Sequence, residues 1–278
     1  MATSEMEKYT LANGTVVRRW PVASPRATVL LVHGLGEHSG RYQHVAAALG
    51  QHDIAMWAPD HPGHGESPGK RCHIDRFDQF FTALDELCDE IDAAHPGVPA
   101  FIVGHSMGGL ITAMYLLSKQ SRFAGAAFSG AAFEVPEPPG AVALFINRLI
   151  AAVIPTLGVL QLDPSEVSRD AEVVRRYRED PLVHDGKVSA RLAVELFGAM
   201  ETLRERRREL CLPILVMHGE ADVMTPAAGS RQFFEAVGSE EKTLRLYPGL
   251  YHEIFNEPEQ AQVLGELCDW LDARIAAA

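Results

Sequence analysis

The sequence predicts an α/β fold in which a mostly parallel central sheet carries helices on both faces and a helical cap is inserted between two parts of the core. Short runs rich in Val, Ile, Leu and Ala alternate with longer segments whose apolar residues recur every three or four positions, the pattern of strand–helix–strand units. Residues 131–210 break this alternation. We therefore predict a core formed by residues 1–130 and 211–278, with a cap (lid) at 131–210.

The expected strands are short apolar runs. Residues 27–33 (ATVLLVH) and 54–59 (IAMWAP) are apolar almost throughout, as strands covered by helices on both faces should be. The other strands are expected at 16–20, 100–104, 125–129, 214–218 and 243–247. Because helical segments separate most of them, we expect a mostly parallel sheet.

Helices are expected between these strands. In residues 75–94, Phe77, Phe80 and Leu84 belong to a single apolar stripe with spacings of three and four. The other helices are expected at 41–49, 106–117, 227–237 and 259–275. The segment 131–210 contains four prolines in EVPEPP and IPT, then helical patterns, and no convincing strand. We expect it to cover the carboxyl edge of the sheet, where α/β sheets bind ligands.

The composition is that of a folded globular protein with an acidic surface. Of 278 residues, 47% are hydrophobic, far more than a disordered chain contains. The chain has 25 basic and 37 acidic residues and a net charge of −12, so it lacks the basic stripe that would bind nucleic-acid phosphates. The densest basic run, RERRR at 204–208, is expected to be a solvated helix face.

Location is predicted from the cysteines and from two segments that could meet a membrane. We interpret the cysteines as reduced thiols of a cytoplasmic protein because they are widely spaced: Cys72, Cys88, Cys211 and Cys268. Residues 1–15 lack the charged-then-apolar pattern of a signal peptide. Asn147, Arg148 and Pro155 interrupt the apolar stretch 141–160, so a membrane-spanning helix is not expected.

The strongest functional signal is Gly104-His105-Ser106-Met107-Gly108, which fits the G-x-S-x-G nucleophile elbow. In this motif a strand turns into a helix within one residue and leaves the serine hydroxyl at the tip, in a strained backbone conformation. The glycines are needed because strand and helix approach each other closely. The flanking sequences AFIVG and GLITAMYLL supply the required strand and helix. We therefore predict that Ser106 is a nucleophile.

A serine nucleophile needs a base and a group that orients the base. In folds with this elbow the chain order is serine, acid, histidine. The loop after the strand at 214–218 offers Glu220 and Asp222. We favour Asp222, which lies where the loop opens before the helix that follows Pro226, and we interpret Glu220 as a loop contact. His252 follows the last strand and is the only histidine after Asp222, so it is the expected base.

This chemistry also needs backbone N–H groups that stabilise a developing oxyanion. We expect one from Met107, directly after the nucleophile, and one from Leu35, because the glycines of the loop 33–36 (HGLG) let its backbone bend toward the serine. The loop 60–67 (DHPGHGES) contains potential metal ligands, but no second cluster completes a site. We interpret it as a structural glycine-rich turn and expect no metal.

Five motifs lie around these residues: HGLGEHSGRY at 33–42, DHPGHGES at 60–67, GHSMGG at 104–109, HGEADVMTP at 218–226 and YHEIFNEPE at 251–259. Together they resemble the monoacylglycerol lipases of the α/β-hydrolase superfamily. G-x-S-x-G alone marks only the superfamily, whereas its combination with HGLGEHSGRY is much more specific. The segment VSRDAEVVRRYREDPL at 167–182 also resembles that family's cap, and the resemblance spans about residues 10–275.

The resemblance implies the α/β-hydrolase fold and hydrolysis of a monoacylglycerol to glycerol and a fatty acid through an acyl-enzyme, without a cofactor. It also implies a polar corner for the glycerol, formed by Glu37, Arg41 and Tyr177. The residues alone leave an alternative open, in which Glu37 and Arg41 form a structural ion pair and Tyr177 anchors the cap.

Such a substrate would give the apolar stretch 141–160 a role, because an apolar cap helix can lie in a membrane interface and open on an acyl tunnel. Its apolar residues cover more than one helix face: Leu144, Phe145, Ile146, Leu149, Ile150, Val153 and Ile154. This favours a peripheral membrane or micelle contact, with Leu149 and Ile150 as candidates, or a homodimer formed through the cap. The alternative is a helix packed on the core.

Other functions fit the same scaffold. A lysophospholipase or a short-chain carboxylesterase would use the same residues. A serine aminopeptidase would need acidic cap groups to bind a free amine, and Glu134 and Glu137 are the candidates. A catalytically inactive binding protein is disfavoured because Ser106, Asp222 and His252 are all present.

Overall fold

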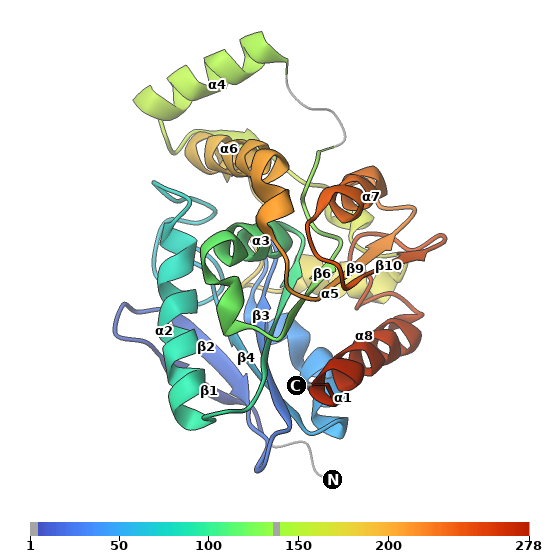
Figure 1. Cartoon of the computed structure of the whole chain (residues 1–278). Helices are drawn as coiled ribbons and strands as arrows, with labels where there is room; N and C mark the ends of the chain where they lie inside the picture. Colours follow the sequence, from blue (N-terminus) through green and yellow to red (C-terminus); the bar gives the residue numbers. More distant parts are fainter. Residues whose placement is uncertain (1–4, 136–139, 278) are drawn as a thin grey trace.

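An eight-stranded sheet runs through the molecule in the order β1-β2-β4-β3-β5-β6-β9-β10 (Figure 1). The computed structural model describes residues 5–135 and 140–277, without the side chains of 141–145. The strands are β1 (Glu7–Thr10), β2 (Val16–Trp20), β3 (Ala27–Val32), β4 (Ile54–Pro59), β5 (Ala100–His105), β6 (Gly125–Ser129), β9 (Ile214–Gly219) and β10 (Lys242–Tyr247). Only β1–β2 and β2–β4 pair antiparallel in this sheet, so the predicted mostly parallel sheet is confirmed.

Helices cover both faces of the sheet, so the core has two parts. On one side lie α2 (Gln79–Ala94) and α3 (Met107–Lys119); on the other lie α1 (Gln43–Gln51) and α8 (Gln260–Ile275), which are neighbours in Figure 1. The side chains of β3 alternate between the two parts: Leu30 packs with the first pair of helices and Leu31 with the second. The helix α7 (Ala227–Ala236) follows β9 and contributes Phe233 to the first part.

Two local predictions were wrong, and one strand was missed. The missed strand is the antiparallel edge strand β1. The helix α2 begins at Gln79 instead of residue 75, because the Gln79 side chain accepts hydrogen bonds from the backbone N–H groups of Asp75 and Arg76, which form a preceding turn. Two short strands, β7 (Gly158–Leu160) and β8 (Val188–Ser189), pair in the segment where no strand was expected.

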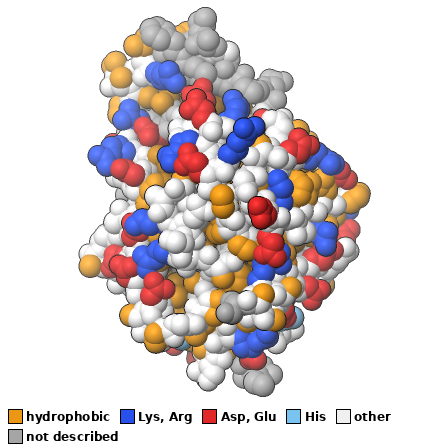
Figure 2. All heavy atoms as spheres, in the orientation of Figure 1, with side chains coloured by type: hydrophobic (Ala, Val, Ile, Leu, Met, Phe, Trp, Pro, Cys, Tyr) orange, Lys and Arg blue, Asp and Glu red, His pale blue; other side chains and the backbone are white. Residues whose placement is uncertain are grey.

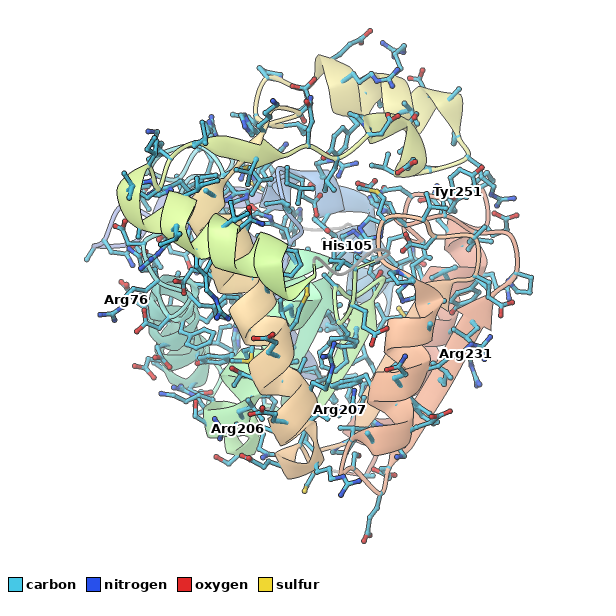
Figure 3. The ribbon with its side chains drawn as sticks, turned by 90° about the horizontal axis from the view of Figure 1, so that it is seen from above. Arg76, His105, Arg206, Arg207, Arg231 and Tyr251 are labelled. Carbon is cyan, nitrogen blue, oxygen red and sulfur yellow. The ribbon has the colours of Figure 1, made fainter. Side chains whose placement is uncertain are left out.

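The predicted cap segment contains α4 (Ala141–Val153), α5 (Ala171–Glu179) and α6 (Ala190–Arg206). It connects β6 to β9, which are neighbours in the sheet. In Figure 1, α6 lies above α3, and α4 lies above α6. The basic run at 204–208 ends α6 and continues into the short helix η4 (Arg207–Glu209), mostly exposed as expected (Figure 3). The boundaries at 131 and 210 stay a prediction.

The outer side of α4 and the strand after it expose apolar side chains. We call these the cap apolar patch: Ile146, Leu149, Val153, Ile154, Leu157, Val159 and Leu160. Leu149 is 52% and Val153 79% exposed, whereas Ala151 is buried and Ile150 half-buried. Hydrophobic side chains are visible beside the grey residues at the top of Figure 2. The side chains of Leu144 and Phe145 lie outside the described residues.

None of the helices in residues 5–135 and 140–277 is long and apolar enough to cross a membrane.

Candidate active site

Ser106 occupies a sharp turn between β5 and α3, as the motif predicts. Its φ of 54° and ψ of −123° are a strained conformation for a residue with a side chain. A Cβ atom on Gly104 would lie 2.6 Å from the carbonyl oxygen of Gly108, and one on Gly108 would lie 2.0 Å from that of Val32. Only glycine fits at both positions, so the motif spacing follows directly from how closely the helix packs on the sheet.

Ser106, His252 and Asp222 form one hydrogen-bonded chain. The Oγ of Ser106 lies 2.8 Å from Nε2 of His252, and Nδ1 of His252 lies 2.7 Å from Oδ2 of Asp222. All three residues are buried, and they come from the loops after β5, β10 and β9. From these partners we assign the neutral tautomer in which Nδ1–H donates to Asp222 and Nε2 accepts from the serine hydroxyl. The structure therefore brings together the three residues predicted from sequence.

The two carboxylates of the β9–α7 loop have different surroundings. Glu220 lies at the surface and pairs with Arg231 at 2.6 Å. Asp222 accepts hydrogen bonds at Oδ1 from the backbone N–H groups of Met224 and Thr225. Burial alone would raise the pKa of Asp222, but the charge of His252 and the hydrogen bonds outweigh burial and hold this pKa below its usual value. Asp222 is thus kept ionised beside the imidazole.

The pKa values of two neighbouring histidines, His252 and His105, are shifted in opposite directions. Burial lowers the pKa of His252, but the negative charge of Asp222 outweighs burial, and the net pKa is raised. The ring of His105 lies 4.9 Å from that of His252 between centroids, near the centre of the view in Figure 3. Burial, followed by the charge of His252, lowers the pKa of His105 to about 4. His105 therefore stays neutral when His252 takes up a proton.

The loop after β3 lies against Ser106. A Cβ on Gly34 would lie 3.1 Å from the Cβ of Ser106, and Leu35 follows directly. Met107 is the first residue of α3, so its N–H is one of the helix N-terminal amides that lack an intrahelical acceptor. This placement is consistent with oxyanion contacts from Leu35 and Met107, which stay a prediction.

Side chains hold the backbone of that loop. His33 Nδ1 lies 2.8 Å from the carbonyl of Gly34, and His61 Nε2 lies 3.0 Å from the carbonyl of His33. Beside them, Asp60 accepts hydrogen bonds from Ser39 and forms a buried ion pair with Arg18. The segment DHPGHGES thus supports its neighbours, in line with its interpretation as a structural turn.

Glu37 and Arg41 lie inside a buried ion network. The carboxylate of Glu37 accepts hydrogen bonds from Gly34 N, Tyr42 Oη and Arg41, each at 2.6 Å. Arg41 also donates two hydrogen bonds to Glu253, at 2.6 and 2.7 Å. Because protein partners engage both charged groups, the geometry supports the structural-pair alternative, and a glycerol contact by Glu37 and Arg41 stays a prediction.

Glu253 was missed by the sequence analysis. It stands directly after the predicted base, and no motif spacing links it to Arg41, which is 212 positions away in the chain.

Tyr177 links the cap segment to the core. It is buried on α5, and the guanidinium of Arg41 lies 4.6 Å from the centre of its ring. Close by, His38 Nε2 lies 2.9 Å from the carboxylate of Asp180. These contacts support the role of a cap anchor. A glycerol contact by Tyr177 stays a prediction.

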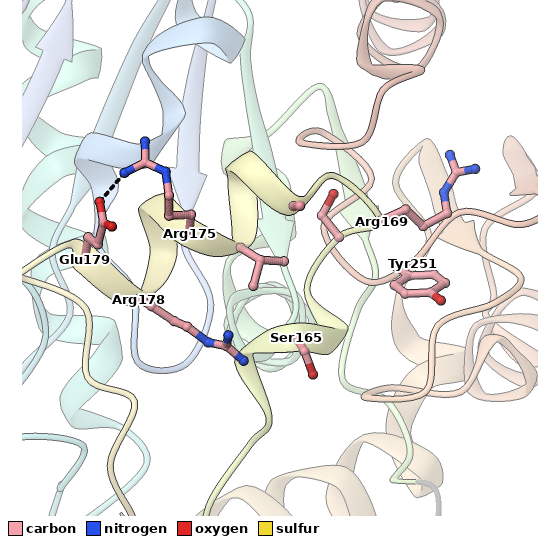
Figure 4. A pocket seen from close by; sticks show the side chains of 9 residues that line it. Ser165, Arg169, Arg175, Arg178, Glu179 and Tyr251 are labelled. Carbon is pink, nitrogen blue, oxygen red and sulfur yellow. Dashed lines mark hydrogen bonds and ion pairs between the residues drawn. The ribbon is translucent and has the colours of Figure 1, made fainter.

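A pocket beside the His252 loop carries several arginines (Figure 4). Its lining includes Ser165, Arg169, Arg175, Arg178, Glu179 and Tyr251. The three arginines each lie within 4 Å of a carboxylate: Arg169 of Glu257, Arg175 of Glu172, and Arg178 of Asp163. Their charges are balanced locally, and we assign the pocket no part in substrate binding.

Comparisons with known proteins identify the family of the whole chain. A family model described as serine aminopeptidase, S33 (Hydrolase_4) matches residues 23–259. A monoacylglycerol lipase of Mycolicibacterium smegmatis is 39% identical over 251 residues, 90% of each chain. A monoglyceride lipase of Homo sapiens is 32% identical over 94% of this chain and 88% of its own. The crystal structure of a Paleococcus ferrophilus monoacylglycerol lipase superposes with a TM-score of 0.85 at 33% identity, covering 97% of this chain and all of that one. This chain therefore belongs to the monoacylglycerol lipase family of the α/β hydrolases.

Proposed function

We propose that this protein hydrolyses the ester bond of monoacylglycerols and releases glycerol and a fatty acid. The observation that carries the proposal is the buried chain from Ser106 through His252 to Asp222, beside the loop that contains Leu35. The identity with relatives that are named monoacylglycerol lipases supports the substrate class.

The geometry supports a two-step mechanism through an acyl-enzyme. Neutral His252 accepts the proton of the Ser106 hydroxyl as Oγ attacks the ester carbonyl carbon. The N–H groups of Leu35 and Met107 stabilise the resulting oxyanion. When the carbon–oxygen bond to glycerol breaks, His252 gives its proton to the departing oxygen. Water then attacks the acyl carbon and loses a proton to His252. The bond between that carbon and Oγ of Ser106 breaks as His252 returns the proton to Oγ, which releases the fatty acid and restores the serine hydroxyl.

We further propose that the cap apolar patch contacts the lipid surface from which the substrate comes. Leu149 and Val153 expose large apolar areas on the outer side of α4, and Ile154, directly after the helix, extends the exposed surface. Burial of such side chains in an interface is favourable. Self-association of two caps through the same surface is the competing outcome. The cytoplasmic location stays a prediction.

The alternative activities differ in what they require. A lysophospholipase or a short-chain carboxylesterase would use the same nucleophile and differ in the groups bound by the cap. An aminopeptidase needs a free acidic group for the substrate amine. Glu134 accepts a hydrogen bond from Gln232 at 3.3 Å and lies 4.0 Å from Arg204, which makes it a poor amine site. Glu137 lies outside the described residues.

A substrate panel tests the proposal. It contains monoacylglycerols of several chain lengths, di- and triacylglycerol, lysophospholipid, a nitrophenyl ester and aminoacyl amides, each assayed with wild type and Ser106→Ala. We expect the highest kcat/KM on a monoacylglycerol and loss of all activity in the variant. A higher kcat/KM on lysophospholipid or on an aminoacyl amide would overturn the substrate assignment, and activity that survives in Ser106→Ala would overturn the nucleophile.

A further inference from the structure

A second histidine contacts the carboxylate of Asp222, and the mechanism above gives it no role. His218 is the penultimate residue of β9, and its side chain is fully buried. Its Nδ1 lies 2.7 Å from Oγ of Ser230 on α7, and its Nε2 lies 2.8 Å from the carbonyl oxygen of Thr225. The ring therefore bridges the start and the end of the loop that carries Asp222.

Nε2 of His218 also lies 3.1 Å from Oδ2 of Asp222, the same oxygen that binds His252. A carbonyl and a carboxylate oxygen both act only as acceptors, so Nε2 must carry a proton. The hydroxyl of Ser230 can donate to Nδ1. We therefore assign the neutral tautomer whose Nε2–H donates to the carbonyl of Thr225, the nearer acceptor, and also lies within reach of Oδ2 of Asp222.

These contacts determine how the carboxylate of Asp222 is turned. Its Oδ1 is held by the backbone N–H groups of Met224 and Thr225, at 2.8 and 2.9 Å. Its Oδ2 accepts hydrogen bonds from His252 at 2.7 Å and from the Thr225 hydroxyl at 2.9 Å, and Nε2 of His218 lies 3.1 Å from it. Rotation of the carboxylate away from His252 would break hydrogen bonds at both oxygens, in a buried site where each is costly to lose.

We propose that His218 is a positioning residue for this hydrolase. Its neutral Nε2–H holds Oδ2 of Asp222 in line with Nδ1 of His252, and its Nδ1 fixes that arrangement to α7 through Ser230. Within the described residues the polar contacts of His218 are with Ser230, Thr225 and Asp222 and not with Ser106, so we infer that it acts through Asp222. This inference rests on the proposed function, because it concerns the same hydrolytic step.

Two substitutions distinguish the contact of an N–H group with Asp222 from the mere presence of a polar side chain. In His218→Gln an amide N–H can reach the place of Nε2. In His218→Asn the shorter amide reaches the place of Nδ1, and thus Ser230, but not Asp222. A matched control is Val216→Ala, which weakens packing in the same strand at a buried residue with no part in the site.

The full-length variants are assayed on a soluble short-chain nitrophenyl ester, with melting temperatures measured in parallel. We expect His218→Gln to keep kcat within about threefold of wild type. We expect His218→Asn to lose about 10- to 100-fold in kcat with little change in KM, the effect of removing an N–H group that lies against a buried charged group. The downfield proton signal of His252 Nδ1–H should shift in His218→Asn alone.

Equal kcat values for the Gln and Asn variants would overturn the inference, as would an equal loss in Val216→Ala at a matched melting temperature. Labelling of Ser106 by a phosphonate reagent in wild type keeps the two proposals distinguishable. If wild type neither reacts with the phosphonate nor cleaves the ester, the proposed function fails. If it does both and the variants are indistinguishable, only the role of His218 fails.

Discussion

Replacing Leu149 and Val153 by Asp should release the protein from lipid vesicles without damaging the chemistry at Ser106. Both side chains lie on the cap apolar patch, 52% and 79% exposed, so charged residues are tolerated there in water. The earlier candidate Ile150 is half-buried, and Val153 is therefore the better second position. The predicted effect is on binding to the lipid surface.

The magnitude follows from the exposed areas. Full burial of a Leu or Val side chain contributes about 1.5–3 kcal/mol. If an interface covers the parts of Leu149 and Val153 that are now exposed, the pair contributes about 2–4 kcal/mol. At about 1.4 kcal/mol for each tenfold change, the double variant should partition roughly 30- to 700-fold more weakly onto vesicles.

The assay is sedimentation with vesicles of neutral phosphatidylcholine, together with hydrolysis of monoacylglycerol in those vesicles and of a soluble nitrophenyl ester. Thr156→Asp is the matched control, because it adds a charge at an exposed polar position of the same segment. We expect the soluble activity of both variants to equal that of wild type. Equal losses of the double variant on both substrates would refute the reasoning, and so would unchanged vesicle binding.

Four further predictions concern the site itself. Ser106→Ala should lose roughly a millionfold in kcat, and phosphonate labelling should disappear with it; labelling at another residue would contradict the assignment. Asp222→Asn should lower kcat by about 10³- to 10⁴-fold because it favours the wrong tautomer of His252. Glu220→Gln, which removes a surface ion pair, should leave kcat nearly unchanged. A large loss of kcat in Glu220→Gln and a small one in Asp222→Asn would identify Glu220 as the acid. The pKa of His252 is raised, and the base must be neutral to act. The value of kcat/KM on the soluble ester should therefore fall as pH drops through a midpoint above about 6.5. A midpoint below that value would show that the effect of burial on the pKa of His252 outweighs the charge of Asp222. Glu37→Gln should lower kcat by about 10- to 100-fold on every ester, because the carboxylate of Glu37 holds the N–H of Gly34 beside Ser106. A rise in KM that is confined to monoacylglycerol would instead favour a contact between Glu37 and the glycerol.

The parts of the fold that could be predicted are those set by local chemistry. Buried parallel strands are apolar throughout, and the elbow at Ser106 requires glycine on both sides because the helix touches the sheet. The edge strand β1 (Glu7–Thr10) is short, polar and mostly exposed, so periodicity does not reveal it. The strands β7 and β8 pair with each other across the cap segment. They are three and two residues long, too short for a periodic pattern to predict the pairing.

The candidate site likewise contains residues that the sequence predicts and residues whose role depends on the folded chain. Ser106, Asp222 and His252 follow from a motif and a chain order, which sequence displays. Whether Glu37 and Arg41 face a substrate or the protein interior depends on Glu253, which only the folded chain brings to them. The contact between His218 and Asp222 likewise depends on how the loop after β9 folds back on its own strand.

The ion network around Arg41 has a consequence for how the protein is made. A ribosome delivers Arg41 212 positions before Glu253. Until that segment emerges, Ser106 lacks its base and Arg41 lacks one of its two carboxylate partners. The catalytic base and these ion pairs are therefore completed together, so a nascent chain that has not yet reached His252 would have no hydrolytic activity.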